Sequence, residues 1–375
     1  MKADIIHISG FDTYSTHDSG NYIVFNALRG LDYDSKMILA LGKSKPDEDT
    51  FLIPKHKIID SIDEAKVVVL HDSLLSHNEI KALHAKLNCQ IVIITMTHFH
   101  LTTENSKGCP SYPELNSQSE KNENKVSLKN KADTIKELPI TLVYGSSYTG
   151  NVTEDYNMYD NKMLIPLPAD VPFCKNSKEE ARRHLGLNIK SKYVFWGTTQ
   201  PGTERKGKGL FDKCLDHLWS QLNNSEREEV VILNVGPNAG KFGKSSNFKT
   251  LHCGYQRSRK DMSVRYKASD ISVCTTIADA GPMMISESMC NETPVIAFDR
   301  SISIDLCVNG ETGYLIPDLN VVSMSNSIKK ILFEDNLEEM SKKSRKKYLT
   351  YHDKDGIMSL WGNLFKKLVE KTNET

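Results

Sequence analysis

Residues 271–317 read ISVCTTIADAGPMMISESMCNETPVIAFDRSISIDLCVNGETGYLIP and contain a strand, a turn, a helix and a second strand in succession. The β-branched run 271–277 predicts a buried parallel strand, and ADAGP at 278–282 predicts a turn. Apolar spacing over 283–290 predicts a helix, and the run 294–298 predicts the next buried strand. These elements form a βαβ unit, so the sheet that contains them is expected to be parallel.

The turn and helix at 278–290 contain two acidic residues. Asp279 lies in the loop between strand and helix, and Glu287 lies eight residues later, about two turns of helix further on. Ligands of such units bind at the carboxyl ends of the strands, where free N–H groups at a helix N-terminus attract phosphate. Asp279 is therefore expected beside a ligand; the alternative is that both acids only cap or solvate the helix start. Pro282 has no N–H group, which leaves the neighbouring backbone as the source of phosphate donors. These candidate donors are Gly281, Met283 and Met284.

The segment resembles the nucleotide-sugar signature of glycosyltransferase family 4, the retaining enzymes of the GT-B fold. The likeness is to the subfamily of bacterial surface polysaccharide enzymes, of the colanic acid and O-antigen type. It rests on Asp279, Pro282 and Glu287, on ETPVIAF at 292–298, and on NGETGYL at 309–315. Upstream, GTTQPGTERKGKGLFDKCL at 197–215 resembles the family's strand, basic loop and helix. The sequence departs from the family at Asp279, where Glu is usual, and at 290–292, where a Gly is missing.

The resemblance implies a role for each of these residues. Glu287 would accept hydrogen bonds from the ribose hydroxyl groups of the nucleotide, and Asp279 would face the donor sugar. Arg205 and Lys206 would hold the diphosphate, whose negative charge grows on the leaving nucleotide as the glycosidic bond breaks. Lys208 offers a competing register for the catalytic lysine, and for Arg205 a surface role is the alternative.

Candidate residues on the acceptor side come from two loops of the first half of the chain. His98 and His100 follow the strand predicted at 90–96. His98 is similar in position to a family residue that contacts the donor sugar or the acceptor, which makes it a catalytic candidate. Gly20 falls in the place of the family's Gly-rich acceptor loop, and His17 is a further substrate-binding candidate there. A structural role is the alternative for His98 and His100.

Composition narrows the class of protein. Lys and Arg total 48, as do Asp and Glu, so no overall positive field draws the chain to nucleic acid. The eight cysteines include no CxxC pair, which predicts reduced thiols of a cytoplasmic protein rather than disulfides or a zinc site. Neither a signal peptide nor the roughly 20 apolar residues of a membrane span is found. The basic run at 342–347 favours a solvated helix face, with peripheral contact to the cytoplasmic face of the membrane as the alternative.

The chain is long enough for two domains, and its Pro-rich tract at 164–172 suits a connection between them. The predicted fold class is α/β: a GT-B fold of two Rossmann-like domains that face an interdomain cleft. Residues 1–165 are expected to form the acceptor-side domain and 166–350 the nucleotide-sugar domain. Residues 351–375 are expected to cross back to the first domain as a helix.

Periodicity places the individual elements. Strands are predicted at 4–8, 36–41, 67–71, 90–96, 140–143, 193–197, 230–235, 250–252, 271–277 and 294–298. One charged helix is predicted at 329–349. A second helix begins at Asp355 and carries an apolar stripe of Ile357, Leu360, Trp361, Leu364 and Leu368.

The function that these observations favour is transfer of a sugar, with retention, from a UDP- or GDP-linked donor to a glycan or lipid-linked acceptor of a bacterial surface polysaccharide. Neither a cofactor nor a metal is expected, because the cations and the helix N-terminus can neutralise the diphosphate. A nucleotide-sugar epimerase of the same fold and a non-catalytic two-domain binding protein remain as alternatives.

Overall fold

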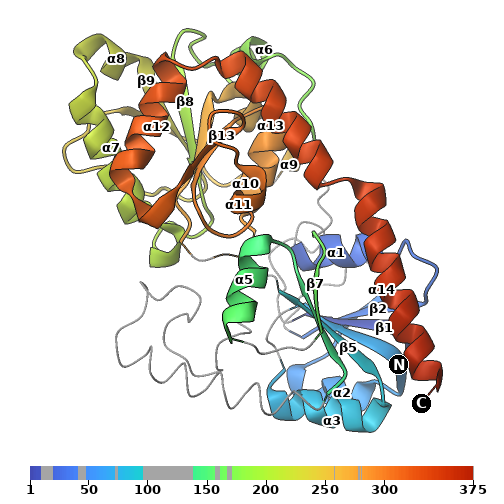
Figure 1. Cartoon of the computed structure of the whole chain (residues 1–375). Coiled ribbons are helices and arrows are strands. Elements are labelled where there is room, and N and C mark those ends of the chain that lie inside the picture. The colour runs from blue at the N-terminus through green and yellow to red at the C-terminus, as the bar shows by residue number, and fades with distance from the viewer. Residues whose placement is uncertain are drawn as a thin grey trace, which may run out of the picture. The chain divides into compact units, whose positions relative to one another are not determined.

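The computed structural model describes residues 1–9, 20–40, 48–71, 75–95, 138–156, 161–166, 171–256, 258–277, 279 and 281–374. The chain divides into two compact units (Figure 1). The first unit comprises Met1–Ala169 and His352–Thr375, and the second comprises Asp170–Tyr351. Each unit has its own parallel sheet, covered by helices on both faces.

The first unit contains a sheet of strand order β3-β2-β1-β4-β5-β6-β7. Its strands are β1 (Lys2–Ser9), β2 (Ser35–Leu39), β3 (Thr50–Leu52), β4 (Glu64–Leu70), β5 (Gln90–Thr95), β6 (Ile140–Tyr144) and β7 (Asn161–Leu164). Its helices are α1 (Gly20–Leu28), α2 (Ile58–Ser61), α3 (His77–Leu87), α5 (Ser147–Tyr156) and α14 (Lys354–Glu374), with a 3₁₀ turn, η2 (Lys55–Lys57).

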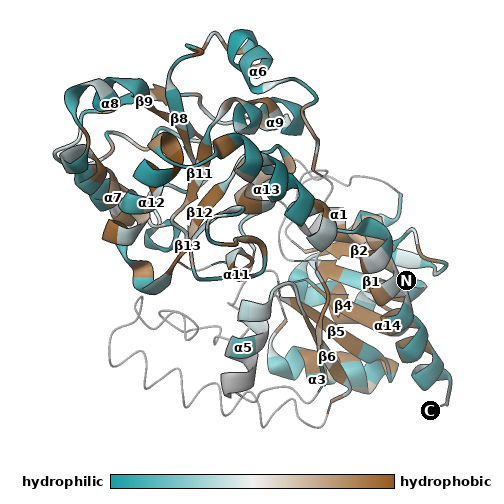
Figure 2. Ribbon diagram, turned by 45° about the horizontal axis from the view of Figure 1, so that its top comes forward, coloured by the Kyte–Doolittle hydropathy of each residue, from teal (hydrophilic) through white to brown (hydrophobic). Residues whose placement is uncertain are grey.

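Alternation along the strands builds two cores in this unit. Ile6 and Ile8 of β1 pack against α2 and α3, whereas Ile5 faces α1 and α14. Successive strand residues point to opposite faces, and a parallel sheet buried on both faces therefore has strands that are apolar throughout. Figure 2 shows this as apolar strands β1, β4 and β5.

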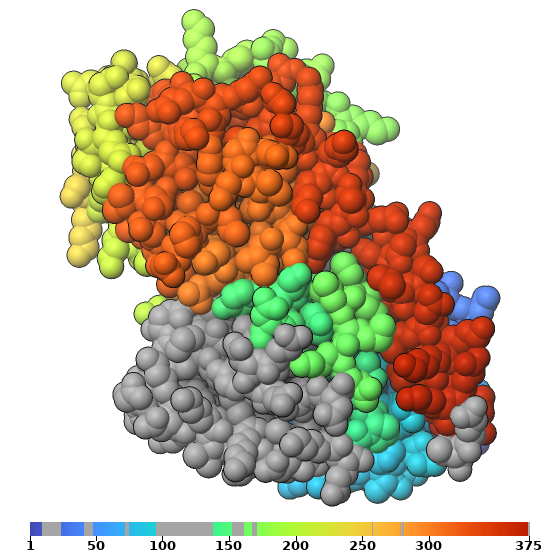
Figure 3. Space-filling view, viewed as in Figure 1, coloured from blue at the N-terminus to red at the C-terminus, as the bar shows by residue number. Residues whose placement is uncertain are grey.

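Helix α14 closes one face of the first sheet. Ile357, Trp361, Leu364 and Leu368 are buried there together with Phe365, which the predicted stripe omitted. Leu360 was wrongly included, since its side chain is 42% exposed. An α-helix has 3.6 residues per turn. An apolar face centred on positions 361, 364, 365 and 368 therefore leaves position 360 at its edge. The outer face of α14 lies on the surface of its unit (Figure 3).

The second unit contains a sheet of strand order β10-β9-β8-β11-β12-β13. Its strands are β8 (Lys192–Gly197), β9 (Val230–Val235), β10 (Lys249–His252), β11 (Ile271–Cys274), β12 (Val295–Phe298) and β13 (Gly313–Ile316). Its helices are α6 (Lys178–His184), α7 (Lys208–Gln221), α8 (Asn224–Glu229), α9 (Arg259–Ala268), α10 (Met283–Cys290), α11 (Ser303–Leu306), α12 (Val321–Phe333) and α13 (Leu337–Tyr351). Two 3₁₀ turns are η5 (Glu204–Lys206) and η6 (Pro317–Leu319).

Two helical layers enclose the second sheet. On one face α7 and α12 bury residues such as Phe211 and Ile328 against β8. On the other face α9, α10 and α13 contribute Tyr266, Ile285 and Tyr348. The layers position the loops at the carboxyl edge of the sheet, where each strand gives way to its helix.

Three features of the predicted elements were wrong. The helix expected at 329–349 is two helices, because Glu334 leaves helical geometry and Asn336 caps α13 by accepting the Glu339 N–H at 3.2 Å. The strand expected at 271–277 ends at Cys274, where the loop of the site begins. Strands β3, β7 and β13, of three or four residues each, were not predicted.

Candidate functional site

The order of strands in the second unit reverses at one point. The chain runs outward through β8, β9 and β10, then returns to place β11 against the other side of β8. In open parallel sheets such a reversal separates the loops that follow the two central strands, and ligands bind there. The loops in question join β8 to α7 and β11 to α10. These loops, together with the helix α10 that follows the second of them, contain the residues that the sequence proposed for the donor site.

Hydrogen bonds join these two loops to each other. The Ile277 N–H donates to the Arg205 carbonyl at 2.8 Å, and the Thr275 hydroxyl donates to the Lys206 carbonyl at 3.1 Å. Trp196 Nε1 donates in turn to the Thr275 hydroxyl oxygen at 3.0 Å. The backbone before α7 is therefore fixed to the end of β11, although the two segments are far apart in sequence.

Gly207 is required for this close approach. Its φ of +69° lies in the left-handed region, and a Cβ at this position would overlap the carbonyl oxygen of Thr275. The glycine also serves as the N-cap of α7. Any other residue would push the basic loop away from β11, and with it the side chains of Arg205 and Lys206.

Both cations of that loop converge on one carboxylate. Lys206 Nζ lies 2.7 Å from Asp279 Oδ2, and Arg205 Nη1 lies 3.3 Å from the same oxygen. The Gly281 N–H donates to Asp279 Oδ1 at 3.3 Å. Burial alone would raise the pKa of Asp279, whose side chain is 16% exposed, but Lys206 and Arg205 outweigh burial and lower this pKa. Asp279 is thus an anion that orients two cations at the carboxyl edge of the sheet.

The start of α10 lies next to this cluster in the chain. Pro282 is the N-cap of α10, and its side chain cannot accept a capping hydrogen bond. The first N–H groups of the helix, those of Met283 and Met284, have no partner within the helix, as at every helix N-terminus. Gly281 has an ordinary φ, and a Cβ there would meet only Ile302, at 3.9 Å. The glycine is therefore not demanded by the backbone, and it leaves the approach to these N–H groups uncrowded.

Glu287 lies in the second turn of α10. Its Oε2 accepts a hydrogen bond of 2.8 Å from the Tyr266 hydroxyl of α9. Burial raises the pKa of Glu287, while the Tyr266 hydrogen bond and the positive charge of Arg259 act in the opposite direction. Sequence reasoning found neither Tyr266 nor Arg259, because both belong to the preceding helix and reach Glu287 only through packing of α9 on α10.

Lys208, the competing lysine, is placed elsewhere. Its Nζ lies 2.7 Å from Asp212 Oδ2 and donates to the Lys241 carbonyl at 3.1 Å. Asp212 also accepts the Gly243 N–H at 3.0 Å, so the group holds the loop before β10. Of the two lysines, Lys206 is the one beside Asp279.

The NGETGYL motif at 309–315 has a structural role in the described geometry. Gly313 has a φ of +145°, and a Cβ there would overlap the Val295 carbonyl of the neighbouring strand. Asn309 Oδ1 accepts the Leu315 N–H at 2.7 Å, and Thr312 accepts the Val308 N–H at 2.8 Å. The motif therefore shapes the entry to β13.

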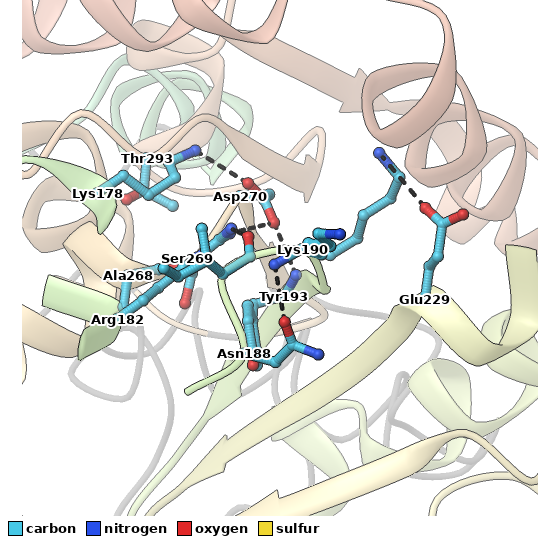
Figure 4. A network of polar contacts seen from close by, with 12 residues as sticks. Lys178, Arg182, Asn188, Lys190, Tyr193, Glu229, Ala268, Ser269, Asp270 and Thr293 are labelled. Atoms are coloured by element: carbon cyan, nitrogen blue, oxygen red, sulfur yellow. Dashed lines mark hydrogen bonds and ion pairs between the residues drawn. The ribbon is translucent and has the colours of Figure 1, made fainter. Parts of the chain in front are cut away.

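A second charged cluster of this unit is structural (Figure 4). Both oxygens of Asp270 are occupied: Lys178 Nζ lies 3.0 Å from Oδ1, and Arg182 Nη2 lies 2.6 Å from Oδ2. The Tyr193 N–H also donates to Oδ2 at 2.7 Å. The network ties α6 to the sheet, at the opposite end of β11 from Asp279, and a buried charge so fully paired has no capacity left for a ligand.

The remaining candidates belong to the first unit. Gly20 is the first residue of α1. His17, His98 and His100 lie outside the described residues, so their roles stay predictions. Within the described part of the chain no cluster of three or more His, Cys, Asp or Glu residues could hold a metal ion. No helix in that same part is both long enough and apolar enough to cross a membrane.

Comparison with known proteins bears on the second unit and on the fold. Residues 243–348 match the family model described as Glycosyl transferases group 1, which covers the Glu287 helix and the 309–315 motif. No curated protein matches the chain.

Solved structures match over nearly the whole chain. Sucrose-phosphate synthase from Thermosynechococcus elongatus is 15% identical with a TM-score of 0.71, covering 98% of this chain and 99% of its own. HepE from Anabaena, in complex with UDP-glucose, is 14% identical with a TM-score of 0.69, covering 97% and 100%. WaaG, a glycosyltransferase involved in lipopolysaccharide biosynthesis, is 13% identical with a TM-score of 0.64, covering 97% and 99%. The chain therefore has the GT-B fold, and the family match within its second unit supports a glycosyltransferase.

Proposed function

We propose that the protein is a retaining glycosyltransferase of family 4, which moves a sugar from a nucleoside diphosphate-sugar to a glycan or lipid-linked acceptor of a bacterial surface polysaccharide. The observation that supports it most is the convergence of Lys206 and Arg205 on Asp279 beside the start of α10, at the reversal point of the sheet. Two cations and a helix N-terminus offer a diphosphate several hydrogen-bond donors and positive charge.

The diphosphate would bind between the basic loop and the helix N-terminus. Negative charge accumulates on the leaving nucleotide as the bond to the sugar breaks, and preorganised donors stabilise that charge more in the transition state than in the ground state. Lys206 supplies a compact charge and Arg205 a bidentate fork. The N–H groups of Met283 and Met284 add the helix dipole, so cation and helix together perform the neutralisation without a cofactor.

Asp279 and Glu287 would recognise the two ends of the donor. Asp279 holds Lys206 in place and presents its carboxylate to the sugar hydroxyl groups. Glu287 keeps Oε2 on Tyr266, while Oε1 has no hydrogen-bond partner among the described residues and suits a ribose hydroxyl. The structure of HepE with UDP-glucose shows a protein of similar fold that binds this class of donor.

The first unit is proposed to bind the acceptor, with His98 as a catalytic residue and His17, Gly20 and His100 as binding residues. The domain limits proposed from the sequence are 1–165, 166–350 and 351–375. The proposed location is cytoplasmic, with a peripheral position at the inner membrane. His98→Ala and His100→Ala should lower transfer to an acceptor more than donor hydrolysis.

One experiment tests the central proposal. The protein is incubated with a panel of UDP- and GDP-sugars, and slow donor hydrolysis is followed by ¹H NMR, which also reports the anomeric configuration of the released sugar before it equilibrates. Hydrolysis with retained configuration supports the proposal, and inversion contradicts it. An epimerase would return a changed sugar, and a binding protein would bind nucleotide without turnover. Lys206→Ala should lower the activity by roughly two orders of magnitude, whereas Lys208→Ala is the matched control that leaves Asp279 and its cations intact.

A further inference from the structure

Helix α9 carries a cation that no part of the proposed chemistry uses. Arg259 is the first residue of α9, and Tyr266 follows it by seven residues, which is two turns and nearly the same helix face. Met262 lies between them on that face and packs into the same apolar cluster as Tyr266. The face that bears Arg259 is thus the face that α9 turns toward α10 and Glu287.

One nitrogen of the Arg259 guanidinium is out of contact with water, although the residue as a whole is only partly buried. Its Nη2 is buried and has no hydrogen-bond partner in the described part of the chain. A buried donor left unpaired destabilises the fold, and more so when it is charged, so such a group is retained where it meets a charge or a ligand. The Glu287 carboxylate on the facing helix is the candidate for that charge: the positive charge of Arg259 lowers the pKa of Glu287, although no direct ion pair joins the two side chains in the described structure.

The groups around Glu287 show why a positive charge is needed beside its carboxylate. From α9 the carboxylate faces Tyr266, whose hydroxyl occupies Oε2, and Arg259. On its own helix Glu287 acts electrostatically on the Cys290 thiol, and Arg345 of α13 donates a hydrogen bond to the Cys290 carbonyl. Burial favours the neutral form of Glu287, in which one oxygen carries a proton and accepts hydrogen bonds from hydroxyl groups poorly. A counter-charge is needed to keep both oxygens as acceptors.

We propose that Arg259 is a positioning residue, a cation on the first turn of α9 that keeps the Glu287 carboxylate ionised and open to the vicinal hydroxyl groups of a ribose. This inference rests on the proposed function for the identity of the ligand, but not for the charge state of Glu287. It adds a second residue of α9, after Tyr266, to a site built from the loops after β8 and β11 and from α10.

The direct test measures the charge of Glu287 without any ligand. Glutamate labelled with ¹³C at Cδ is incorporated, the Glu287 signal is assigned by its loss in Glu287→Gln, and its shift is followed from pH 4 to pH 9. Arg259→Gln should move the midpoint upward by about one unit, the lower end of the effect of a neighbouring opposite charge. Arg259→Lys should keep the original midpoint. Arg265→Gln, which removes the same charge from the same helix, is the matched control and should change nothing. Arg259→Met replaces the Gln variant if that variant does not fold.

A binding arm separates the two proposals. Calorimetry with UDP and with GDP is repeated between pH 5.5 and 8.5. Arg259→Gln should lose affinity at the acidic end, by at most about tenfold because a one-unit shift sets that limit, and should recover as pH rises. An unchanged midpoint in Arg259→Gln, or an equal loss of affinity at every pH, would overturn the inference, since the second result marks a direct ligand contact. A shifted midpoint in a protein that binds neither nucleotide supports the inference and contradicts the proposed function.

Discussion

Acid should destabilise the first unit through two buried histidines. His7 of β1 and His71, directly after β4, are fully buried, and His7 Nδ1 lies 2.8 Å from His71 Nε2. Burial lowers the pKa of His71 from 6.5 to about 3, and burial together with the neighbouring His71 holds the pKa of His7 well below its usual range. Both rings are therefore neutral in the folded unit at pH 5, whereas both are charged in the unfolded chain.

The size of the effect follows from proton linkage. Because the folded pKa lies below the unfolded one, the stabilisation is complete above about pH 6.5 and is lost as pH falls toward the folded pKa. Going from pH 7 to pH 5, the unfolded chain gains about three quarters of a proton per histidine that the folded unit does not bind. The free energy of unfolding should fall by about 2 kcal/mol for His71 and by about 4 kcal/mol for the pair.

Hydrogen exchange of peptides from β1 and β4, corrected for the intrinsic pH dependence of exchange and measured against urea concentration, reports this unit separately from the other. His71→Gln should roughly halve the loss between pH 7 and pH 5, whatever it does to stability at pH 7. His56→Gln, which removes an exposed histidine of the same unit, is the control. A wild type equally stable at pH 7 and pH 5, or an unchanged loss in His71→Gln, would refute the reasoning.

Four further predictions concern the second unit. Lys206→Ala should lower turnover by roughly two orders of magnitude, the scale of removing one preorganised donor from developing charge, while Lys208→Ala should change it little; steady-state kinetics decide, and reversed effects would contradict the assigned lysine. Glu287→Ala should weaken nucleotide binding by about 1–3 kcal/mol in calorimetry, and unchanged affinity would remove the residue from the site. Gly207→Ala should lower the melting temperature and weaken nucleotide binding together, because its Cβ displaces the basic loop from β11; a variant with wild-type values for both would show that the loop adapts. Asp270→Ala should cost about 3–5 kcal/mol in urea melts by leaving a buried cation unpaired, and a neutral result would show that water replaces the carboxylate.

Local pattern determined much of the second unit. The helix at Met283–Cys290 and the strand at Val230–Val235 have the limits that their apolar spacing predicts. Asp279 follows from a strand-to-helix turn, where parallel sheets gather their ligands. Lys206 was proposed from the resemblance to the family's basic loop, with Lys208 as the competing register. These features depend on residues close in sequence, whose periodicity is visible without the fold.

Only the tertiary structure decided which residues meet. Lys206 reaches Asp279 across 73 positions of sequence, and Lys208, two residues later, turns instead to Asp212. The left-handed Gly207 between them sets that choice, through contact with a strand that no local pattern could place. The partners of Glu287 and the pairing of His7 with His71 likewise arise from packing. Their energies come from burial and from charges brought together by folding, and neither can be read from the residues adjacent in the chain.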